Sequence, residues 1–172
     1  MNNISKTHAW IQEHIEPHYH CIDLTCGNGH DTKFLAQLCS HVIAVDIQPQ
    51  AIENTKKRLK DFNNVNFILE DHSKLNFEDY SPLNGAIYNL GYLPHGDKSL
   101  ITKTESTIKS LNALLPHLTD FLVITCYPGH EGGDVEAEAV KTWIEDHNLN
   151  PTIYSYPTEN SPIAYCIALG GK

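Results

Sequence analysis

The sequence predicts a single α/β domain whose mostly parallel sheet has seven strands and is covered by helices on both faces. Short apolar runs alternate with segments of helical period along the whole chain, which is the pattern of a doubly wound sheet. No linker, repeat or low-complexity tract divides the chain, and 172 residues is the length of one ordinary domain. We therefore expect residues 1–172 to form one domain.

Seven segments have the composition of strands buried on both faces. Each is short, nearly continuous in hydrophobicity and rich in β-branched or aromatic residues. They are residues 21–24, 41–46, 65–69, 83–89, 121–126, 152–156 and 164–169. The last two have no helical segment between them, so we expect them to pair as an antiparallel hairpin at one edge of the sheet.

Five segments have helical period. They are residues 6–15, 32–39, 49–62, 103–115 and 135–147. Ile52, Leu59 and Phe62 share one face of the third segment, and Pro49 suits its first turn. A doubly wound sheet that ends in a hairpin is the Rossmann-like architecture of the class I methyltransferases, and the pattern resembles that fold more than a dinucleotide dehydrogenase.

The composition excludes several classes of protein. The chain has 21 acidic and 12 basic residues, and the resulting formal charge of −9 disfavours extended nonspecific binding of nucleic acid. No apolar run approaches the length of a membrane span, and the N-terminal segment lacks the basic leader and apolar core of a secretory signal. We expect a cytoplasmic protein with no membrane partner.

The cysteines and histidines indicate neither a disulfide scaffold nor a metal site. Five cysteines include no C-x-x-C pair, so we expect reduced, buried thiols. His14, His18, His20 and Cys21 are close in sequence, but their spacing matches no zinc signature. We instead interpret this segment as the end of a helix, followed by solvent-exposed residues that lead into a strand.

A glycine-containing loop follows the first predicted strand. Gly27 and Gly29 let the backbone turn sharply and approach a ligand at the start of the next helix. A nicotinamide fingerprint would need a third glycine where this chain has Thr32, whereas the preceding acid fits the motif of S-adenosylmethionine enzymes. We therefore predict S-adenosylmethionine as the cofactor, bound by Asp23, Cys26, Gly27, Asn28, Gly29 and Asp31.

The next two strands also end in residues that suit an adenosine ligand. Asp46 ends the second strand, where a carboxylate can accept both ribose hydroxyls, and Gln48 follows it. Asp71 and His72 follow the third strand, where class I methyltransferases hold the adenine amino group. The alternative for Asp71 is a solvated strand end. Agreement among three strand ends predicts one adenosyl site.

The fourth strand leads into a loop, residues 89–98, that is rich in turn-forming and polar groups. We expect this loop to bind the substrate. Residues 89–92 have the length and ends of the N-P-P-Y motif of amino methyltransferases, although Leu90 and Gly91 replace both prolines. Asn89 would accept a hydrogen bond from an amine and Tyr92 would stack on a base, whereas the alternative is a tight turn with Tyr92 packed against it.

Nearly the whole chain resembles the bacterial tRNA 5-aminomethyluridine methyltransferases of the wobble position, formerly labelled rRNA methylases. The resemblance rests on the D-L-T-x-G-N-G-x-D-T stretch at 23–32, on 45–48, 71–72 and 89–98, and on the Y-P-G-H-x-G-G block at 127–133. The segment 159–163 departs from the N-x-P-P-type stretch expected there.

The resemblance implies methyl transfer from S-adenosylmethionine to the aminomethyl nitrogen on C5 of a uridine in the tRNA anticodon. Orientation of an unprotonated amine would supply much of the rate. The amine must also lose a proton, for which Tyr92, His95, Asp97 and His130 are the candidates beside Asn89.

An anticodon stem-loop is a small RNA, which suits an acidic protein. Lys98, Lys103 and Lys109 lie in or after the predicted substrate loop and would contact phosphates, making binding weak and salt-sensitive. The basic segment 56–60 is more typical of a solvated helix face. A homodimer is a further expectation, because a domain of this size offers little area for RNA.

Other functions remain open alternatives. The methyl acceptor would then be rRNA or a small-molecule amine. Cys126 resembles in position the nucleophile of RNA cytosine-C5 methyltransferases, although the favoured interpretation is a core residue. A nicotinamide-dependent oxidoreductase is favoured only by the two glycines and Asp46. A non-catalytic RNA-binding module would bind the cofactor without methyl transfer.

Overall fold

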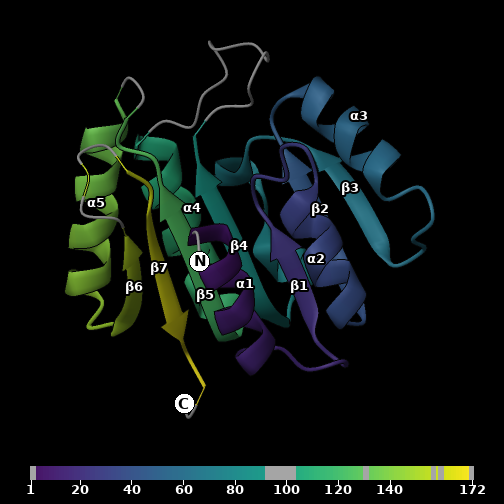
Figure 1. The fold of residues 1–172 in the computed structure, drawn as a ribbon, viewed down its shortest axis with the longest axis horizontal. Coiled ribbons are helices and arrows are strands. Elements are labelled where there is room, and N and C mark those ends of the chain that lie inside the picture. The colour runs from purple at the N-terminus through teal and green to yellow at the C-terminus, as the bar shows by residue number, and fades with distance from the viewer. Residues whose placement is uncertain (1–2, 92–103, 130–131, 156–157, 159–160, 171–172) are drawn as a thin grey trace.

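A seven-stranded sheet forms the centre of the computed structural model, which describes residues 3–91, 104–129, 132–155, 158 and 161–170 (Figure 1). The strands are β1 His20–Asp23, β2 His41–Asp46, β3 Val65–Leu69, β4 Leu83–Leu90, β5 Leu118–Cys126, β6 Pro151–Ser155 and β7 Ile163–Ala168. Their order in the sheet is β3-β2-β1-β4-β5-β7-β6. The predicted number of strands is confirmed.

The sheet is parallel from β3 through β5, and β7 runs antiparallel to both of its neighbours. The chain therefore places β7 between β5 and β6, so the predicted hairpin of the last two strands is confirmed. Strand order reverses beside β1, since β2 and β3 lie on one side of it and β4 and β5 on the other. Ligands of such sheets bind at this reversal, beyond the carboxyl ends of the strands.

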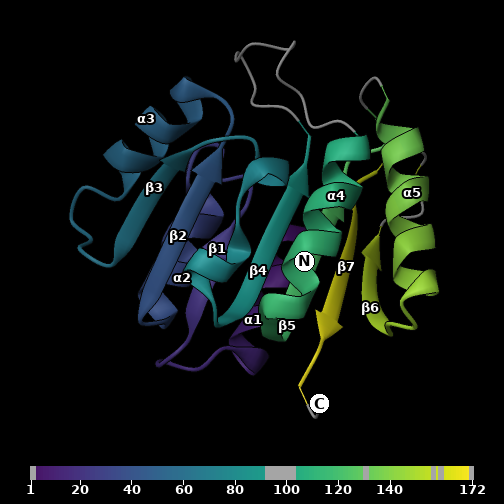
Figure 2. The ribbon, with the colours of Figure 1, turned by 180° about the vertical axis from the view of Figure 1, so that it is seen from behind.

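Helices cover both faces of the sheet. They are α1 Asn3–His14, α2 His30–Leu38, α3 Pro49–Arg58, α4 Thr104–Leu114 and α5 Gly133–Asp146. Figure 1 shows α1 and α2 in front of the sheet, and α3 packs on α2, β2 and β3; Figure 2 shows α4 and α5 on the opposite face. The fold class predicted from the sequence, a class I methyltransferase sheet, is thereby confirmed.

The core consists of one apolar layer on each face of the sheet. Trp10, Ile11 and Leu35 belong to the layer under α1 and α2. Leu111 and Trp143 belong to the layer under α4 and α5. Burial of large aliphatic and aromatic side chains on both faces explains why the strand segments read as continuous apolar runs.

Two connections differ from the sequence prediction. The helix predicted over 49–62 ends at Arg58, because Leu59 leaves helical backbone angles (φ −106°, ψ 20°) and the chain turns. Leu59 is nevertheless buried, so the apolar period continues beyond the helix. Two short 3-10 turns, η1 His72–Lys74 and η2 Phe77–Tyr80, connect β3 to β4 where the sequence predicted no helix.

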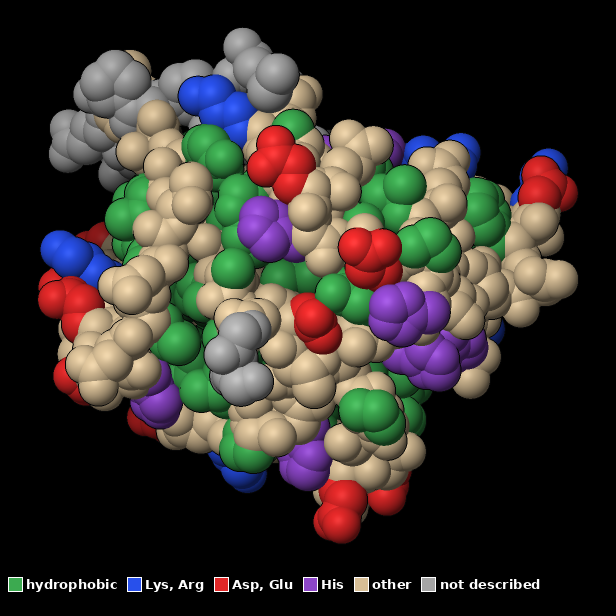
Figure 3. Space-filling view, turned by 90° about the horizontal axis from the view of Figure 1, so that it is seen from below, with side chains coloured by type: hydrophobic (Ala, Val, Ile, Leu, Met, Phe, Trp, Pro, Cys, Tyr) green, Lys and Arg blue, Asp and Glu red, His purple; other side chains and the backbone are tan. Residues whose placement is uncertain are grey.

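Histidine side chains are spread over the face at the amino-terminal ends of the parallel strands (Figure 3). His14 stacks on Trp10, and the rings of His20 and His41 lie 5.9 Å apart. Among the described residues, no group of three or more histidine, cysteine or acidic side chains is arranged to hold a metal ion. All five cysteines are free and buried.

None of the helices in the described parts of the chain is long and apolar enough to cross a membrane. The compartment expected from the sequence stays a prediction.

Candidate active site

The loop between β1 and α2 lies at the reversal of strand order. Gly27 and Gly29 have positive φ angles of 53° and 86°, which L side chains rarely adopt. A Cβ on Gly29 would also lie 3.1 Å from the Cα and Cγ2 atoms of Thr55. The second glycine of the motif is therefore required both by its backbone angles and by the close approach of α3.

Asp23 ends β1 and fixes the loop from beneath. Its carboxylate is fully buried and accepts hydrogen bonds from the Thr32 hydroxyl at 2.8 Å and the Thr25 backbone N–H at 3.3 Å. Burial, followed by the charge of Asp31, raises the pKa of Asp23 to about 8. Asp23 thus stabilises the loop, and its predicted contact with a cofactor stays a prediction.

Asp46 joins the ends of β1 and β2. One carboxylate oxygen accepts the backbone N–H of Gly27 and the other that of Gln48, both at 3.0 Å. Burial raises the pKa of Asp46, and the two N–H groups oppose this rise. Each oxygen keeps a second lone pair, so the carboxylate can accept further hydrogen bonds from a ligand.

Side chains of α3 hold the loop from its other side. Thr55 donates its hydroxyl hydrogen to the carbonyl oxygen of Gly27 at 3.0 Å. The Arg58 guanidinium donates to the Asn28 carbonyl at 2.7 Å, and Asn54 donates to the Asn28 side-chain oxygen at 2.9 Å. Sequence reasoning missed these three residues: Arg58 was assigned to a solvated basic face, and Thr55 lay within an apolar helical stripe.

Cys26 lies in the floor of the same loop. Its sulfur lies 3.4 Å from the Thr55 hydroxyl oxygen, and burial raises the pKa of the thiol. The group with which Cys26 would contact the cofactor is therefore a neutral, buried thiol.

Two buried polar atoms near the ends of β2 and β3 have no hydrogen-bond partner among the described residues: Gln48 Oε1 and His72 Nδ1. Gln48 is 4% exposed and His72 is 7% exposed. Burial lowers the pKa of His72 to about 4, so its ring is neutral at physiological pH. Buried polar atoms without partners are rare and costly, which indicates that a ligand supplies the missing groups.

Asp71 lies between β3 and η1 and is the N-cap residue of η1. Its Oδ1 atom accepts both the backbone N–H and the hydroxyl of Ser73, at 2.9 and 2.8 Å. Partial burial would raise the pKa of Asp71, but these two hydrogen bonds outweigh it and the pKa is lowered. The carboxylate is therefore charged and caps η1, with its second oxygen available.

Asn89, near the carboxyl end of β4, is connected directly to the glycine loop. Its backbone N–H donates to the Thr25 hydroxyl, and its side-chain Nδ2 donates to Asp31 Oδ2, both at 2.6 Å. The Tyr127 hydroxyl, which follows β5, lies 3.4 Å from Asn89 Oδ1. His8 of α1 contacts the other Asp31 oxygen at 2.6 Å. His8 and Tyr127 were not identified from the sequence.

Six predicted site residues lie outside the described residues. They are Tyr92, His95, Asp97, Lys98, Lys103 and His130. Their roles in catalysis and RNA binding stay predictions. Lys109 is described and is exposed on α4.

Cys126 does not have the surroundings of a nucleophile. It ends β5, is fully buried, and burial raises the pKa of its thiol to about 12. The thiolate is the reactive form of cysteine, so this site disfavours covalent attack. The interpretation of Cys126 as a core residue fits this environment.

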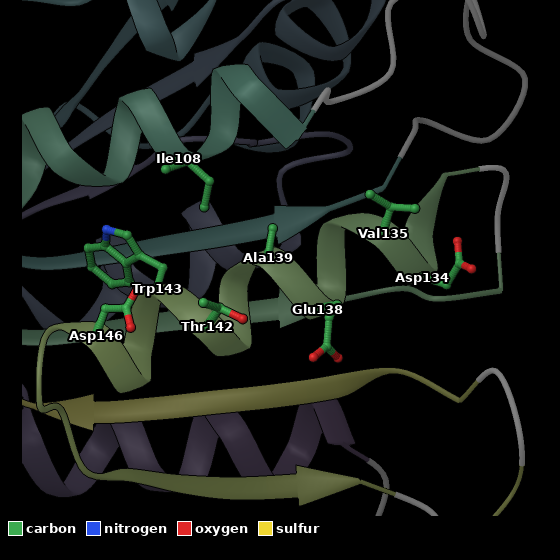
Figure 4. Close-up of a pocket in the computed structure, with 8 residues that line it drawn as sticks. All are labelled: Ile108, Asp134, Val135, Glu138, Ala139, Thr142, Trp143 and Asp146. Carbon is green, nitrogen blue, oxygen red and sulfur yellow. The ribbon is translucent and has the colours of Figure 1, made fainter.

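A second recess lies between α4 and α5, away from the glycine loop (Figure 4). Its lining includes Ile108, Val135 and Trp143, with Asp134, Glu138 and Asp146 at its rim. It contains none of the predicted site residues, so the candidate active site is the cluster at the carboxyl ends of β1 to β4.

Comparisons with known proteins place the chain among methyltransferases. Residues 42–162 match the family model described as "Putative rRNA methylase". A chloroplastic tRNA (mnm(5)s(2)U34)-methyltransferase of Arabidopsis thaliana is 35% identical over 142 residues, which are 71% of this chain and 51% of that protein. The chain thus spans about half the length of this curated relative.

Two solved structures cover almost the entire chain. One is a crystal structure from Clostridium thermocellum described as an rRNA methylase, with a TM-score of 0.87, 33% identity, and coverage of 98% of this chain and 97% of that chain. The other is a methyltransferase from Streptococcus mutans in complex with S-adenosylhomocysteine, with a TM-score of 0.86, 30% identity and 98% coverage of both chains.

Proposed function

Since the chain belongs to the family described as "Putative rRNA methylase", we propose that it is a methyltransferase acting on the tRNA wobble uridine. Its donor is S-adenosylmethionine, and its acceptor is the aminomethyl nitrogen on C5 of that uridine. The observation that carries this proposal is the direct contact between Asn89 and the glycine loop through Thr25 and Asp31. This contact brings a residue suited to an amine acceptor to the edge of an adenosyl site.

The residues present fit the adenosyl group. Asp46 presents two oxygens for ribose hydroxyls, while its own position is fixed by two backbone N–H groups. Gln48 Oε1 and His72 Nδ1 are buried polar atoms whose hydrogen-bond partners a bound nucleoside would supply, and Asp71 has an oxygen suited to an exocyclic amine. When bound, S-adenosylmethionine supplies an electrophilic methyl group on a sulfonium centre.

The contribution of the protein to the reaction is orientation. The Asn89 amide donates through Nδ2 to a carboxylate, so its Oδ1 is the atom available to accept a hydrogen bond from the substrate amine. Correct orientation of reacting groups can account for roughly 7–11 kcal/mol of a barrier. The proton that the amine loses would pass to Tyr92, His95, Asp97 or His130.

RNA recognition would use few charges. Lys98 and Lys103 remain the proposed phosphate contacts, and Lys109, exposed on α4, is a third. Few phosphate contacts predict modest affinity that weakens as salt is added. The name of the plant relative, a tRNA (mnm(5)s(2)U34)-methyltransferase, supports this substrate over rRNA. A homodimer stays a prediction.

The test uses tRNA from cells that lack the gene for this protein. The purified protein and S-adenosylmethionine are incubated with this tRNA, and digested nucleosides are analysed by mass spectrometry. We expect 5-aminomethyluridine to decrease and 5-methylaminomethyluridine to appear. Ribosomal RNA from the same cells is the control, and methylation of rRNA without methylation of tRNA would refute the proposed substrate.

Asn89→Ala provides the matched variant. It should lower kcat by about a hundredfold, because a 1 Å misplacement of the acceptor is enough for such a loss. Its affinity for S-adenosylhomocysteine, measured by calorimetry, should stay within about twofold, since Asn89 is not assigned to the adenosyl site. A large loss of cofactor affinity with normal kcat would assign Asn89 to the cofactor instead.

A further inference from the structure

One carboxylate connects the amino-terminal helix to the proposed acceptor residue. Asp31, in the first turn of α2, has His8 Nε2 at 2.6 Å from Oδ1 and Asn89 Nδ2 at 2.6 Å from Oδ2. His8 lies on α1 and Asn89 on β4, so the contact joins three separate elements. Both oxygens of Asp31 are therefore occupied by side chains distant in sequence.

The chemistry of these contacts determines the orientation of the Asn89 amide. An ionised carboxylate only accepts hydrogen bonds, so the Asn89 atom that faces Asp31 must be the amide nitrogen. The amide oxygen then points toward the Tyr127 hydroxyl, at 3.4 Å. By the same reasoning, His8 must carry a hydrogen on Nε2 to donate to Asp31.

The His8 ring is itself held in place. It stacks on Phe34 of α2 with ring centroids 3.8 Å apart and an angle of 4° between the planes. The side chains of His8 and Asp31 are only 22% and 23% exposed. A partly shielded hydrogen bond to a carboxylate is stronger than an exposed one between neutral groups, so the pair can fix the rotamer of Asp31.

We propose that His8 and Asp31 are positioning residues for methyl transfer, which fix the Asn89 amide with its oxygen available to the acceptor amine. The proposal rests on the proposed function only in that Asn89 contacts this amine. Without the His8 hydrogen, one oxygen of Asp31 loses its partner. The carboxylate can then rotate toward water, and the orientation of the Asn89 amide is no longer fixed.

Two variants separate the hydrogen bond from the ring stack. His8→Gln keeps an N–H donor at a similar reach but loses the stack on Phe34. His8→Phe keeps the stack but has no donor. We expect His8→Phe to lower kcat by about tenfold and His8→Gln to stay within about twofold of the wild type. The tenfold loss corresponds to about 1.4 kcal/mol of activation free energy.

Binding and folding provide the controls for these variants. Both variants should unfold cooperatively above the assay temperature, and their affinities for S-adenosylhomocysteine should agree within about twofold, so that a difference in kcat between them reports the lost donor to Asp31. The proposal is wrong if His8→Phe keeps normal kcat, or if His8→Gln is as impaired as His8→Phe.

A spectroscopic readout does not depend on the substrate. With ¹⁵N-labelled asparagine, the Asn89 side-chain amide is assigned by its absence in Asn89→Ala. We expect one strongly downfield, slowly exchanging hydrogen in the wild type and in His8→Gln, and its upfield shift in His8→Phe. If this pattern holds while the tRNA is not methylated, the positioning role stands and the proposed substrate fails. Equal resonances in all three proteins would overturn the positioning role.

Discussion

The carboxylates at the two ends of the candidate site accept hydrogen bonds from different donors, mainly backbone N–H groups at the cofactor end and side chains at the acceptor end. At the cofactor end, backbone N–H groups of Gly27, Gln48 and Ser73 donate to Asp46 and Asp71. At the acceptor end, side chains bond to side chains, from His8 through Asp31 and Asn89 to Tyr127. Backbone donors remain when side chains are exchanged. The cofactor end therefore depends on loop conformation, and the acceptor end on residue identity.

The largest expected effect concerns loop conformation at the cofactor end. Gly29→Ala should lower the free energy of unfolding by about 2–4 kcal/mol, from a left-handed backbone cost and from crowding against Thr55. Affinity for S-adenosylhomocysteine should also fall. Gly27→Ala is the control, because it has a positive φ but no atom nearer than 3.9 Å to its new Cβ, and should cost about 1–2 kcal/mol. Equal effects in denaturant melts of the two variants would contradict the role given to Thr55.

Asp46→Ala should weaken binding of S-adenosylhomocysteine by about 1–3 kcal/mol, because it removes charged hydrogen bonds from the ribose site. Calorimetry of binding measures this difference directly. The Gly27 and Gln48 N–H groups also lose their acceptor, so some of the loss reflects a less ordered loop. Unchanged affinity would show that the ribose lies elsewhere.

Stability should depend on pH through Asp23. Its pKa rises from an ordinary value of 3.8 to about 8 in the folded protein, so the folded state binds a proton that the unfolded chain releases. The stability from this group is fully present below about pH 4 and is lost as the pH rises through about 8. Asn does not titrate at this position. The free energy of unfolding of Asp23→Asn should therefore rise relative to that of the wild type by at most about 1.4 kcal/mol per pH unit across this range. Parallel stability curves, measured by urea unfolding, would exclude a protonated Asp23.

The smallest effect is expected at the acceptor end, at Cys126. Cys126→Ala should leave the rate of methyl transfer unchanged, because a buried thiol with a pKa of about 12 is not a nucleophile at neutral pH. The lost volume should cost about 1–2 kcal/mol of stability. Loss of methyl transfer in a normally folded variant would mean that the acceptor end supplies covalent chemistry as well as orientation.

The sequence was sufficient to predict the sheet, whereas the location of the site stays a prediction. The predicted bounds of β2 and β3 match those observed. β2 is a continuous apolar run that is buried in the sheet, whereas β3 is a partly exposed edge strand that was recognised by its β-branched and aromatic residues. The glycine loop and the strand-end acids were also predicted, since their chemistry follows from residue type and from position at a strand end.

The missed residues share a physical property. His8, Thr55 and Arg58 act through contacts with residues distant along the chain, such as the pairing of His8 with Asp31. No local period marks such contacts, and each of these side chains has an ordinary place in a helix or a turn. Only the packing of α1, α2 and α3 over the sheet brings them to the site.

The position of β7 between β5 and β6 has a consequence for synthesis on the ribosome. Until residues 163–168 have emerged, β5 presents an open edge and β6 has no neighbour to pair with in the sheet. The half of the domain with β1 to β4 can assemble earlier, whereas the half with β5 to β7 must await a late segment. A nascent chain stalled before residue 163 should therefore be prone to aggregate through that edge.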